Sequence, residues 1–232
     1  MVGRGLTGLT LVGGRKLLER ELKLIFGRPR QPGPLHRFIA TLAPLPRLIV
    51  TTNYDTLVED GLRSANVAFH LIMTPVDRLG ASTFLWWRPG DSAARVSDHK
   101  SVLIEPVDVP IVYKIHGGLA PNGDWIRAII TDVDYFEVGG RLYASSYLPM
   151  EVAAVLRRSS LLFLGYSLRD THVRFMVQQS AEPDGQRHFL VTKKISRIDR
   201  VRLNALGIIG VELTIADFIE QFLNAKVQPG TS

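Results

Sequence analysis

Cysteine is absent from the 232 residues of the chain. This absence excludes disulfide bonds, zinc sites built on thiolates and catalysis by a cysteine nucleophile. The histidines do not have the spacing of metal ligands either; they stand at positions 36, 70, 99, 116, 172 and 188. The phosphate-binding loop of P-loop enzymes, the nucleophile elbow of α/β hydrolases and the His-Glu-x-x-His pair are also missing. We therefore predict no metal site and none of these three chemistries.

Long apolar runs are lacking as well, since no stretch approaches the roughly 20 residues that a membrane-spanning helix requires. Glycines interrupt the mild apolar patch of residues 1–14, and no small-residue cleavage site follows it. The net charge of +6 comes mostly from arginine. These arginines are scattered and form no basic block with interleaved aromatic residues, so we do not expect a nucleic-acid partner. We expect a cytoplasmic protein without a membrane anchor.

Hydrophobic residues make up 46% of the chain, enough to bury a core, and we expect residues 1–232 to form a single domain. Apolar runs typical of buried strands alternate with segments of helical periodicity. The expected strands are a run beginning at Leu48 and residues 67–72, 109–115, 128–130, 160–164, 189–192 and 208–215; the expected helices are residues 16–26, 35–42, 57–64, 197–206 and 216–225. Strands separated by helices indicate right-handed crossovers. The predicted fold class is α/β, with a Rossmann-like, mainly parallel sheet and helices on both faces.

Residues 74–107 interrupt this alternation. They are rich in proline, glycine, serine, aspartate and arginine, contain the pair Trp86-Trp87, and show no sustained period of either strand or helix. We predict an irregular insertion here. Two interpretations remain open, a surface insertion anchored by its tryptophans and a lid that covers a substrate or a partner.

Polar or glycine-rich residues stand directly after three of the expected strands. Asn53 and Asp55 follow the first, His116 and Gly117 follow the strand at 109–115, and Gly165 and Ser167 follow the strand at 160–164. Parallel strands present their carboxyl ends at one edge of the sheet, where the ligands of open α/β folds bind. We therefore predict that these residues converge on one ligand-binding cleft.

Each of these residues also has a structural explanation. His116 is either a buried structural histidine or a group that accepts a proton near neutral pH beside a glycine backbone that a ligand can approach. Asn53 suits the turn that it begins, and Asp55 suits the cap of the following helix. Gly165 and Ser167 lead from a strand into a helix, where free N–H groups favour an anion such as phosphate.

The motifs resemble those of a known family. Thr-Thr-Asn-Tyr-Asp at 51–55, Lys-Ile-His-Gly at 114–117 and Phe-Leu-Gly-Tyr-Ser-Leu-Arg-Asp at 163–170 are similar in kind and order to the sirtuin-like domain of bacterial NAD-depleting antiphage defence proteins. The Asp-Tyr pair within residues 131–136 also resembles the segment between the second and third motifs of that family. Thr131 and Asp134 are themselves of the types that cap a helix start. The resemblance runs from about residue 16 to residue 223.

The resemblance implies a reaction and a site. The reaction is cleavage of the nicotinamide–ribose bond of NAD, which passes through an oxocarbenium-like state and needs positioning more than a strong nucleophile. Asn53 would hold the ribose or the attacking water, and His116 would act as general base. The implied cofactor-binding residues are Thr52, Asp55, Gly117, Gly165 and Ser167. The family also suggests assembly, either with further copies of the chain or with a partner of a defence system.

Two departures from the family pattern bear on the activity. Sirtuin deacylases carry a zinc module held by four cysteines, and the lack of cysteine favours the hydrolase branch without zinc. The family also opens with a strand and a Gly-Ala-Gly-x-Ser loop that holds the NAD phosphates, and residues 1–15 contain no such loop. Either the chain is a shortened version of a longer protein, or phosphate binding is altered or lost. The alternatives to an NAD glycohydrolase are a catalytically impaired module that binds NAD or ADP-ribose or scaffolds a partner, and an NAD-dependent deacylase or ADP-ribosyl transferase.

Overall fold

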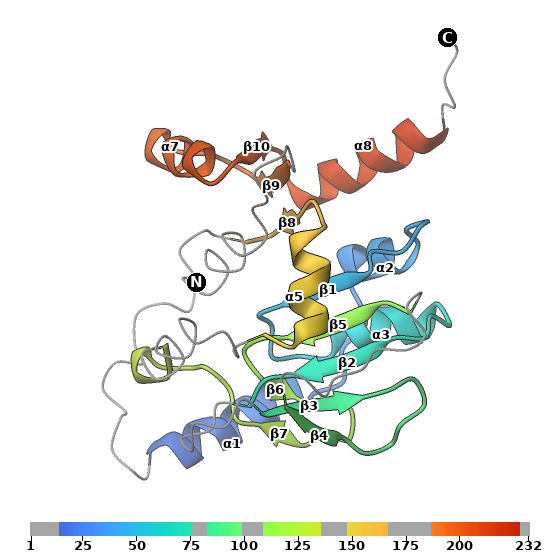
Figure 1. The fold of residues 1–232 in the computed structure, drawn as a ribbon, viewed down its shortest axis with the longest axis vertical. Helices are drawn as coiled ribbons and strands as arrows, with labels where there is room; N and C mark the ends of the chain where they lie inside the picture. The colour runs from blue at the N-terminus through green and yellow to red at the C-terminus, as the bar shows by residue number, and fades with distance from the viewer. Residues whose placement is uncertain (1–13, 76–82, 99–108, 136–147, 167–186, 228–232) are drawn as a thin grey trace. The chain divides into compact units, whose positions relative to one another are not determined.

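The central sheet is built from strands that lie far apart in the sequence. The computed structural model describes residues 14–75, 83–98, 109–135, 148–166 and 187–227, and β1 (Leu48–Thr51) forms one edge of a five-stranded sheet (Figure 1). The strand order is β1-β5-β2-β3-β4, with β2 at His70–Met73, β3 at Thr83–Trp87, β4 at Arg95–Asp98 and β5 at Ile111–Lys114. β5 runs parallel to both β1 and β2, whereas β3 and β4 are antiparallel. The predicted α/β class with a mainly parallel sheet is confirmed.

Three helices belong to the same part of the chain. They are α1 (Gly14–Phe26), α2 (Pro34–Ala40) and α3 (Leu57–Ser64), and the last has the bounds that the sequence predicts. Helices α2 and α3 pack closely at Gly61, where an added Cβ would lie 3.0 Å from the carbonyl oxygen of His36. The core beneath them is apolar and comprises Ala40, Ile49, Val58, Leu62, Leu71, Met73, Trp87, Val112 and Ala120.

Two segments differ from the sequence prediction. The stretch predicted to be irregular contains β3 and β4, which extend the sheet beyond β2 as an antiparallel pair. Trp86 and Trp87 are successive residues on β3 and both are buried, so this strand is covered on both faces and lacks the alternation that would identify it. Residues 128–130, predicted as a strand, have no regular structure. A two-stranded sheet of β6 (Gly118–Leu119) and β7 (Trp125–Ile126) precedes them.

The chain divides into two compact units, and the boundary lies after Glu151, within helix α5 (Met150–Arg157). The second unit has a parallel sheet of its own, in the order β10-β9-β8. Its elements are β8 (Leu162–Leu164), β9 (His188–Thr192), α7 (Arg197–Ala205), β10 (Ile208–Glu212) and α8 (Ile215–Val227). Its core is made of Leu190, Ile195, Leu203 and Ile208. The prediction of a single domain stays a prediction.

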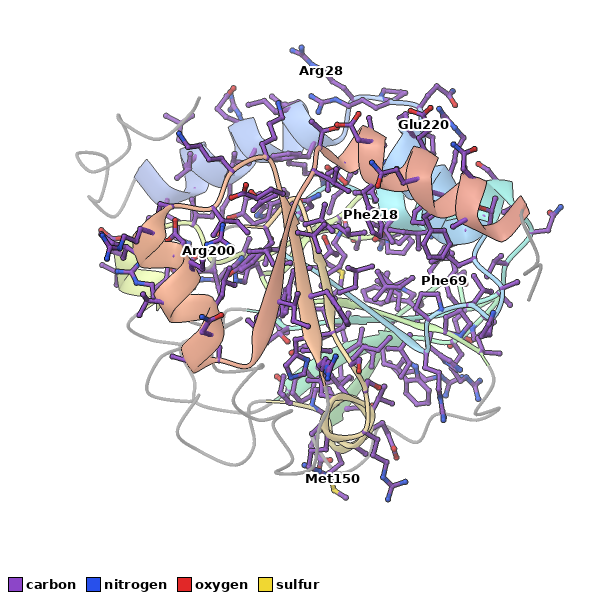
Figure 2. The ribbon with its side chains drawn as sticks, turned by 90° about the horizontal axis from the view of Figure 1, so that it is seen from above. Arg28, Phe69, Met150, Arg200, Phe218 and Glu220 are labelled. Carbon is purple, nitrogen blue, oxygen red and sulfur yellow. The ribbon has the colours of Figure 1, made fainter. Side chains whose placement is uncertain are left out.

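Helix α8 is amphipathic. Phe218 and Glu220 lie on different sides of it in Figure 2, as expected for residues two positions apart on a helix. The ring of Phe218 is 6.1 Å from that of Phe222, one turn further along. Neither this helix nor any other in the described part of the chain is long and apolar enough to cross a bilayer.

Candidate functional site

Asn53 and His116 follow neighbouring parallel strands at the same edge of the sheet. Thr51, the last residue of β1, is in register with Lys114, the last residue of β5. The pairing continues one residue further, because the Ile115 N–H donates to the Thr51 carbonyl at 3.2 Å. Asn53 and His116 each come two residues after this level pair of strand ends. The structure thus brings these two predicted residues to one edge, while their chemical roles stay predictions.

The Asn53 side chain is exposed and open to a ligand. Its backbone N–H donates to the Thr51 hydroxyl at 3.1 Å, which fixes the backbone just after β1. Its carboxamide makes no hydrogen bond with any residue in the described ranges. Thr52, which lies between Thr51 and Asn53, is half-buried. The side chain to which the resemblance gives a substrate role is therefore fixed at its backbone, while its carboxamide is available to a ligand.

Tyr54 anchors the strand-end turn to the protein. Its hydroxyl donates to the carbonyl of Ile129, and its ring lies edge-on to Phe26 at 5.5 Å and to Trp125 at 5.7 Å. Its carbonyl accepts a hydrogen bond from the Leu119 N–H at 2.7 Å. Apart from the presence of an aromatic residue in the motif, nothing in the sequence predicts this role of Tyr54. Both the side chain and the backbone of Tyr54 therefore hold in place the turn that carries Asn53.

Asp55 has the structural role that the sequence allowed. Its Oδ1 accepts from the N–H of Leu57, the first residue of α3, at 3.1 Å. A carboxylate in this position satisfies a free backbone donor and complements the positive end of the helix. The cofactor-binding role implied for Asp55 by the resemblance stays a prediction.

His116 is almost fully buried, with 3% of its surface exposed. Its ring packs edge-on against Tyr135 at 5.8 Å, and its carbonyl accepts from the Ile129 N–H at 3.1 Å. This burial limits the access of a substrate to the imidazole. A base in such a place is held rigidly, which favours proton transfer at a fixed position.

The two glycines after His116 allow close packing of the protein's own backbone. Gly117 has φ +70°, and a Cβ there would lie 2.7 Å from the Arg127 carbonyl oxygen. Gly118 has φ +118°, and a Cβ there would lie 2.6 Å from the Tyr54 Cα. Only glycine fits such positions without strain. Glycine is thus explained at 117 by packing, and the predicted contact of Gly117 with NAD stays a prediction.

Lys114 and Glu59 form a buried ion pair beneath the turn. The Lys114 Nζ lies 3.2 Å from the Glu59 Oε1, and neither residue is exposed. Burial raises the pKa of Glu59 above its ordinary value, and the charge of Lys114 opposes this shift. The same ammonium group donates to the backbone carbonyls of Tyr54, Asp55 and Leu119. Lys114 belongs to the Lys-Ile-His-Gly motif, but nothing in the sequence predicts its pairing with Glu59.

Asp134 caps the segment that follows the site and binds helix α1. Its Oδ2 accepts from the N–H groups of Ile130 and Thr131 at 2.9 and 2.8 Å, which confirms the predicted helix start. Its Oδ1 pairs with the guanidinium of Arg15, which also donates to the Ala128 carbonyl at 2.8 Å. Burial would raise the pKa of Asp134, but the backbone donors and Arg15 outweigh it and hold the pKa below its ordinary value. Nothing in the sequence around Arg15 predicts its contact with Asp134.

The third predicted motif lies in the second unit. Gly165 follows β8 with φ +67°, so it turns the chain as the sequence predicts. β8 pairs with β9 in the three-stranded sheet. Ser167 lies outside the described residues. The convergence of Gly165 and Ser167 with Asn53 and His116 stays a prediction.

A metal site was not predicted, and the described residues contain no group of three or more histidine, aspartate or glutamate side chains that could hold a metal ion.

A family model described as "SIR2-like domain" matches residues 47–209, more than two thirds of the chain. The match includes Asn53, His116 and Gly165 and the motifs around them. No curated protein matches the chain.

Proposed function

The chain belongs to the SIR2-like domain family, and from this premise we propose that it cleaves the nicotinamide–ribose bond of NAD. SIR2-like domains use NAD, so membership is consistent with an NAD-related activity. The observation that supports hydrolysis in this chain is the placement of Asn53 and His116 two residues beyond level strand ends, with the Asn53 carboxamide unpartnered within the described residues.

The reaction needs only water as a second substrate. As the bond from the ribose C1′ to the nicotinamide nitrogen breaks, its electron pair returns to the ring and neutral nicotinamide leaves. Water then forms the new bond to C1′, and its proton passes to His116 and on to solvent, which gives ADP-ribose. Asn53 would orient the water or the ribose hydroxyl group through its carboxamide.

The test is release of nicotinamide from NAD by the purified protein, measured by chromatography. We expect Asn53→Ala and His116→Ala each to lower the rate by about 100-fold or more, the range found when a general base is removed. Asn204→Ala is the matched control, because Asn204 is exposed on α7 and alanine favours a helix. Equal rates in Asn53→Ala and wild type would contradict the assignment. Activity only with an acylated or acceptor protein present would indicate a deacylase or transferase instead.

A second candidate is a module that binds NAD or ADP-ribose without turnover. It is favoured by the burial of His116, which limits the access of water and substrate to the imidazole, and by Gly117, where the Arg127 carbonyl oxygen, 2.7 Å from the Cβ position, explains the glycine without a ligand. Calorimetry separates the two functions. Saturable heat of NAD binding without release of nicotinamide supports the module, whereas release supports the hydrolase.

We also propose that the cleavage serves as a defence effector that depletes NAD in the cell. A domain that hydrolyses NAD without an acceptor removes a cofactor that many reactions share. Expression of the wild-type chain should lower cellular NAD, and expression of Asn53→Ala should not. Unchanged NAD in cells that contain folded, active protein would contradict the effector role while leaving the hydrolase assignment intact.

A further inference from the structure

The Lys114 ammonium group is enclosed by oxygen atoms from three segments. Its Nζ lies 3.1 Å from the Leu119 carbonyl, 3.4 Å from the Tyr54 carbonyl and 3.2 Å from the Glu59 Oε1, and it also donates to the Asp55 carbonyl. These oxygens belong to the turn after β1, to helix α3 and to strand β6. Lys114 itself ends β5.

All four partners of the Lys114 amine are oxygen atoms. An ammonium group has three donors and no acceptor, and carbonyl and carboxylate oxygens have no proton to give. The Glu59 carboxylate supplies the balancing charge through Oε1, while its Oε2 is buried without a hydrogen-bond partner in the described residues.

A pair of this kind needs an explanation other than stability. Burying two charges costs desolvation energy that their attraction seldom exceeds, and well-packed apolar residues of similar size often serve a fold equally well. The Asp55 carbonyl, however, accepts from Lys114, and no other donor to it lies within the described residues, whereas the Tyr54 carbonyl also accepts from the Leu119 N–H. A buried cation at the end of β5 satisfies the Asp55 carbonyl and adds a second donor at the Tyr54 carbonyl.

We propose that the Lys114–Glu59 pair is a positioning device that fixes the turn of residues 52–55 and thereby sets the Asn53 carboxamide relative to His116. Lys114 and Glu59 are then positioning residues, since neither is exposed to touch a substrate. The consequence for NAD rests on the proposed function, whereas the fixing of the turn does not.

Three variants test the device. Lys114→Met leaves Glu59 buried without a partner, and Glu59→Met leaves Lys114 without its counterion. Lys114→Met/Glu59→Met removes both charges and retains the length of both side chains. The matched control is Arg63→Met, which removes the exposed ion pair of Arg63 with Asp60 on the same helix.

The first measurement is amide hydrogen exchange by NMR in the protein without NAD. The reporters of the turn are the N–H groups of Asn53, Leu57 and Leu119, which bond to the turn or lie in it. The reporters of the far end of the same sheet are those of His70 and Ile111, which bond to the Pro110 and Arg47 carbonyls.

We expect the turn reporters to exchange about ten- to hundredfold faster in both variants that lack Lys114, the factor of a lost hydrogen bond to a charged group. The far-end reporters should change less than the turn reporters. Thermal unfolding should show the double variant to be more stable than Lys114→Met alone, because no unpaired charge stays buried. If the turn still exchanges faster in the double variant, although that variant regains stability relative to Lys114→Met, the fixing of the turn is separate from general stability.

Two results would overturn the proposal. One is exchange of the turn reporters at the wild-type rate in the double variant; the other is acceleration of turn and far-end reporters by the same factor. The second measurement, NAD binding by calorimetry, should be weakened in the double variant and unchanged in Arg63→Met. If the wild type binds no NAD, the proposed function fails, and exchange alone still decides whether Lys114 fixes the turn.

Discussion

At the scale of single residues, the glycine after Gly117 is the most constrained position near the site. Gly118→Ala should destabilise the protein because its Cβ would lie 2.6 Å from the Tyr54 Cα at φ +118°. A backbone in this region alone costs a side chain about 1–3 kcal/mol, and the overlap adds to that cost. Urea unfolding followed by tryptophan fluorescence measures the loss.

Gly123→Ala separates the two effects. Gly123 also has a positive φ, +81°, but nothing lies within 4 Å of its Cβ position. The free energy of unfolding of Gly123→Ala should fall only by the cost of the backbone conformation, about 1–3 kcal/mol. Equal losses at the two positions would show that the close approach of Gly118 to the Asn53-bearing turn has no energetic importance.

His70 makes the stability depend on pH. It is buried on β2, and its Nδ1 accepts from the Trp86 indole N–H at 3.3 Å. Burial lowers its pKa below 6.5, helped by the charge of Arg88 and opposed by that of Asp91. The unfolded chain therefore binds this proton at a higher pH than the folded chain, so stability is greatest above pH 6.5 and falls as the pH drops from 6.5 toward the folded pKa.

His70→Gln should weaken this dependence. The measurement is the melting temperature of variant and wild type between about pH 7.5 and 5.5, the range in which histidine titrates. Burial lowers the pKa of His188 in the second unit too, so the variant should keep part of the slope. An identical slope in both proteins would contradict the role given to His70.

At the scale of elements, Asp134 joins helix α1 to the segment beside His116. Asp134→Ala removes the cap on Ile130 and Thr131 and the buried ion pair with Arg15, which keeps its pair with Glu19. We expect a loss greater than that of an exposed cap, which is about 0.5–2 kcal/mol. Ser196→Ala is the matched control, because Ser196 caps α7 at an exposed position without a buried ion pair.

The same contact predicts acid sensitivity. The pKa of Asp134 is held below 3.8 in the folded protein, so its contribution is present above that pH and is lost as pH falls through the folded pKa. Equal losses of unfolding free energy in Asp134→Ala and Ser196→Ala at neutral pH would contradict the bridging role of Asp134.

The sequence predicted elements where local signals are strong. Helix α3 was predicted with its observed bounds, and the parallel strands β1, β5 and β9 were found from apolar runs that stop at polar or glycine residues. It missed β3 because a short strand buried on both faces has no alternation, and it read residues 128–130 as a strand from apolarity alone.

The site was predictable only where its residues stand directly after strands. Asn53 and His116 stand after strands and are of reactive types, so the sequence indicates them. Lys114, Glu59 and Arg15 act through partners more than 50 positions away, and no local pattern encodes such pairing. The third motif was expected at the same sheet edge, yet its strand pairs in a sheet of its own.

At the scale of the whole molecule, the SIR2-like match crosses the boundary between the two units. This favours the predicted single domain, and we expect one cooperative unfolding transition. All three tryptophans lie in the first unit, at positions 86, 87 and 125, so fluorescence reports that unit and far-ultraviolet circular dichroism reports both. Coincident urea midpoints are the expected result. Separate midpoints would show two domains.

The edge formed by the ends of β1 and β5 is proposed to bind NAD through Asn53. The most direct test is an NMR titration with NAD that follows the side-chain amide resonance of Asn53, assigned by its loss in Asn53→Ala. We predict a saturable shift of this resonance, with that of Asn204 unchanged. An Asn53 resonance that stays in place while NAD binds or is consumed would contradict the claim.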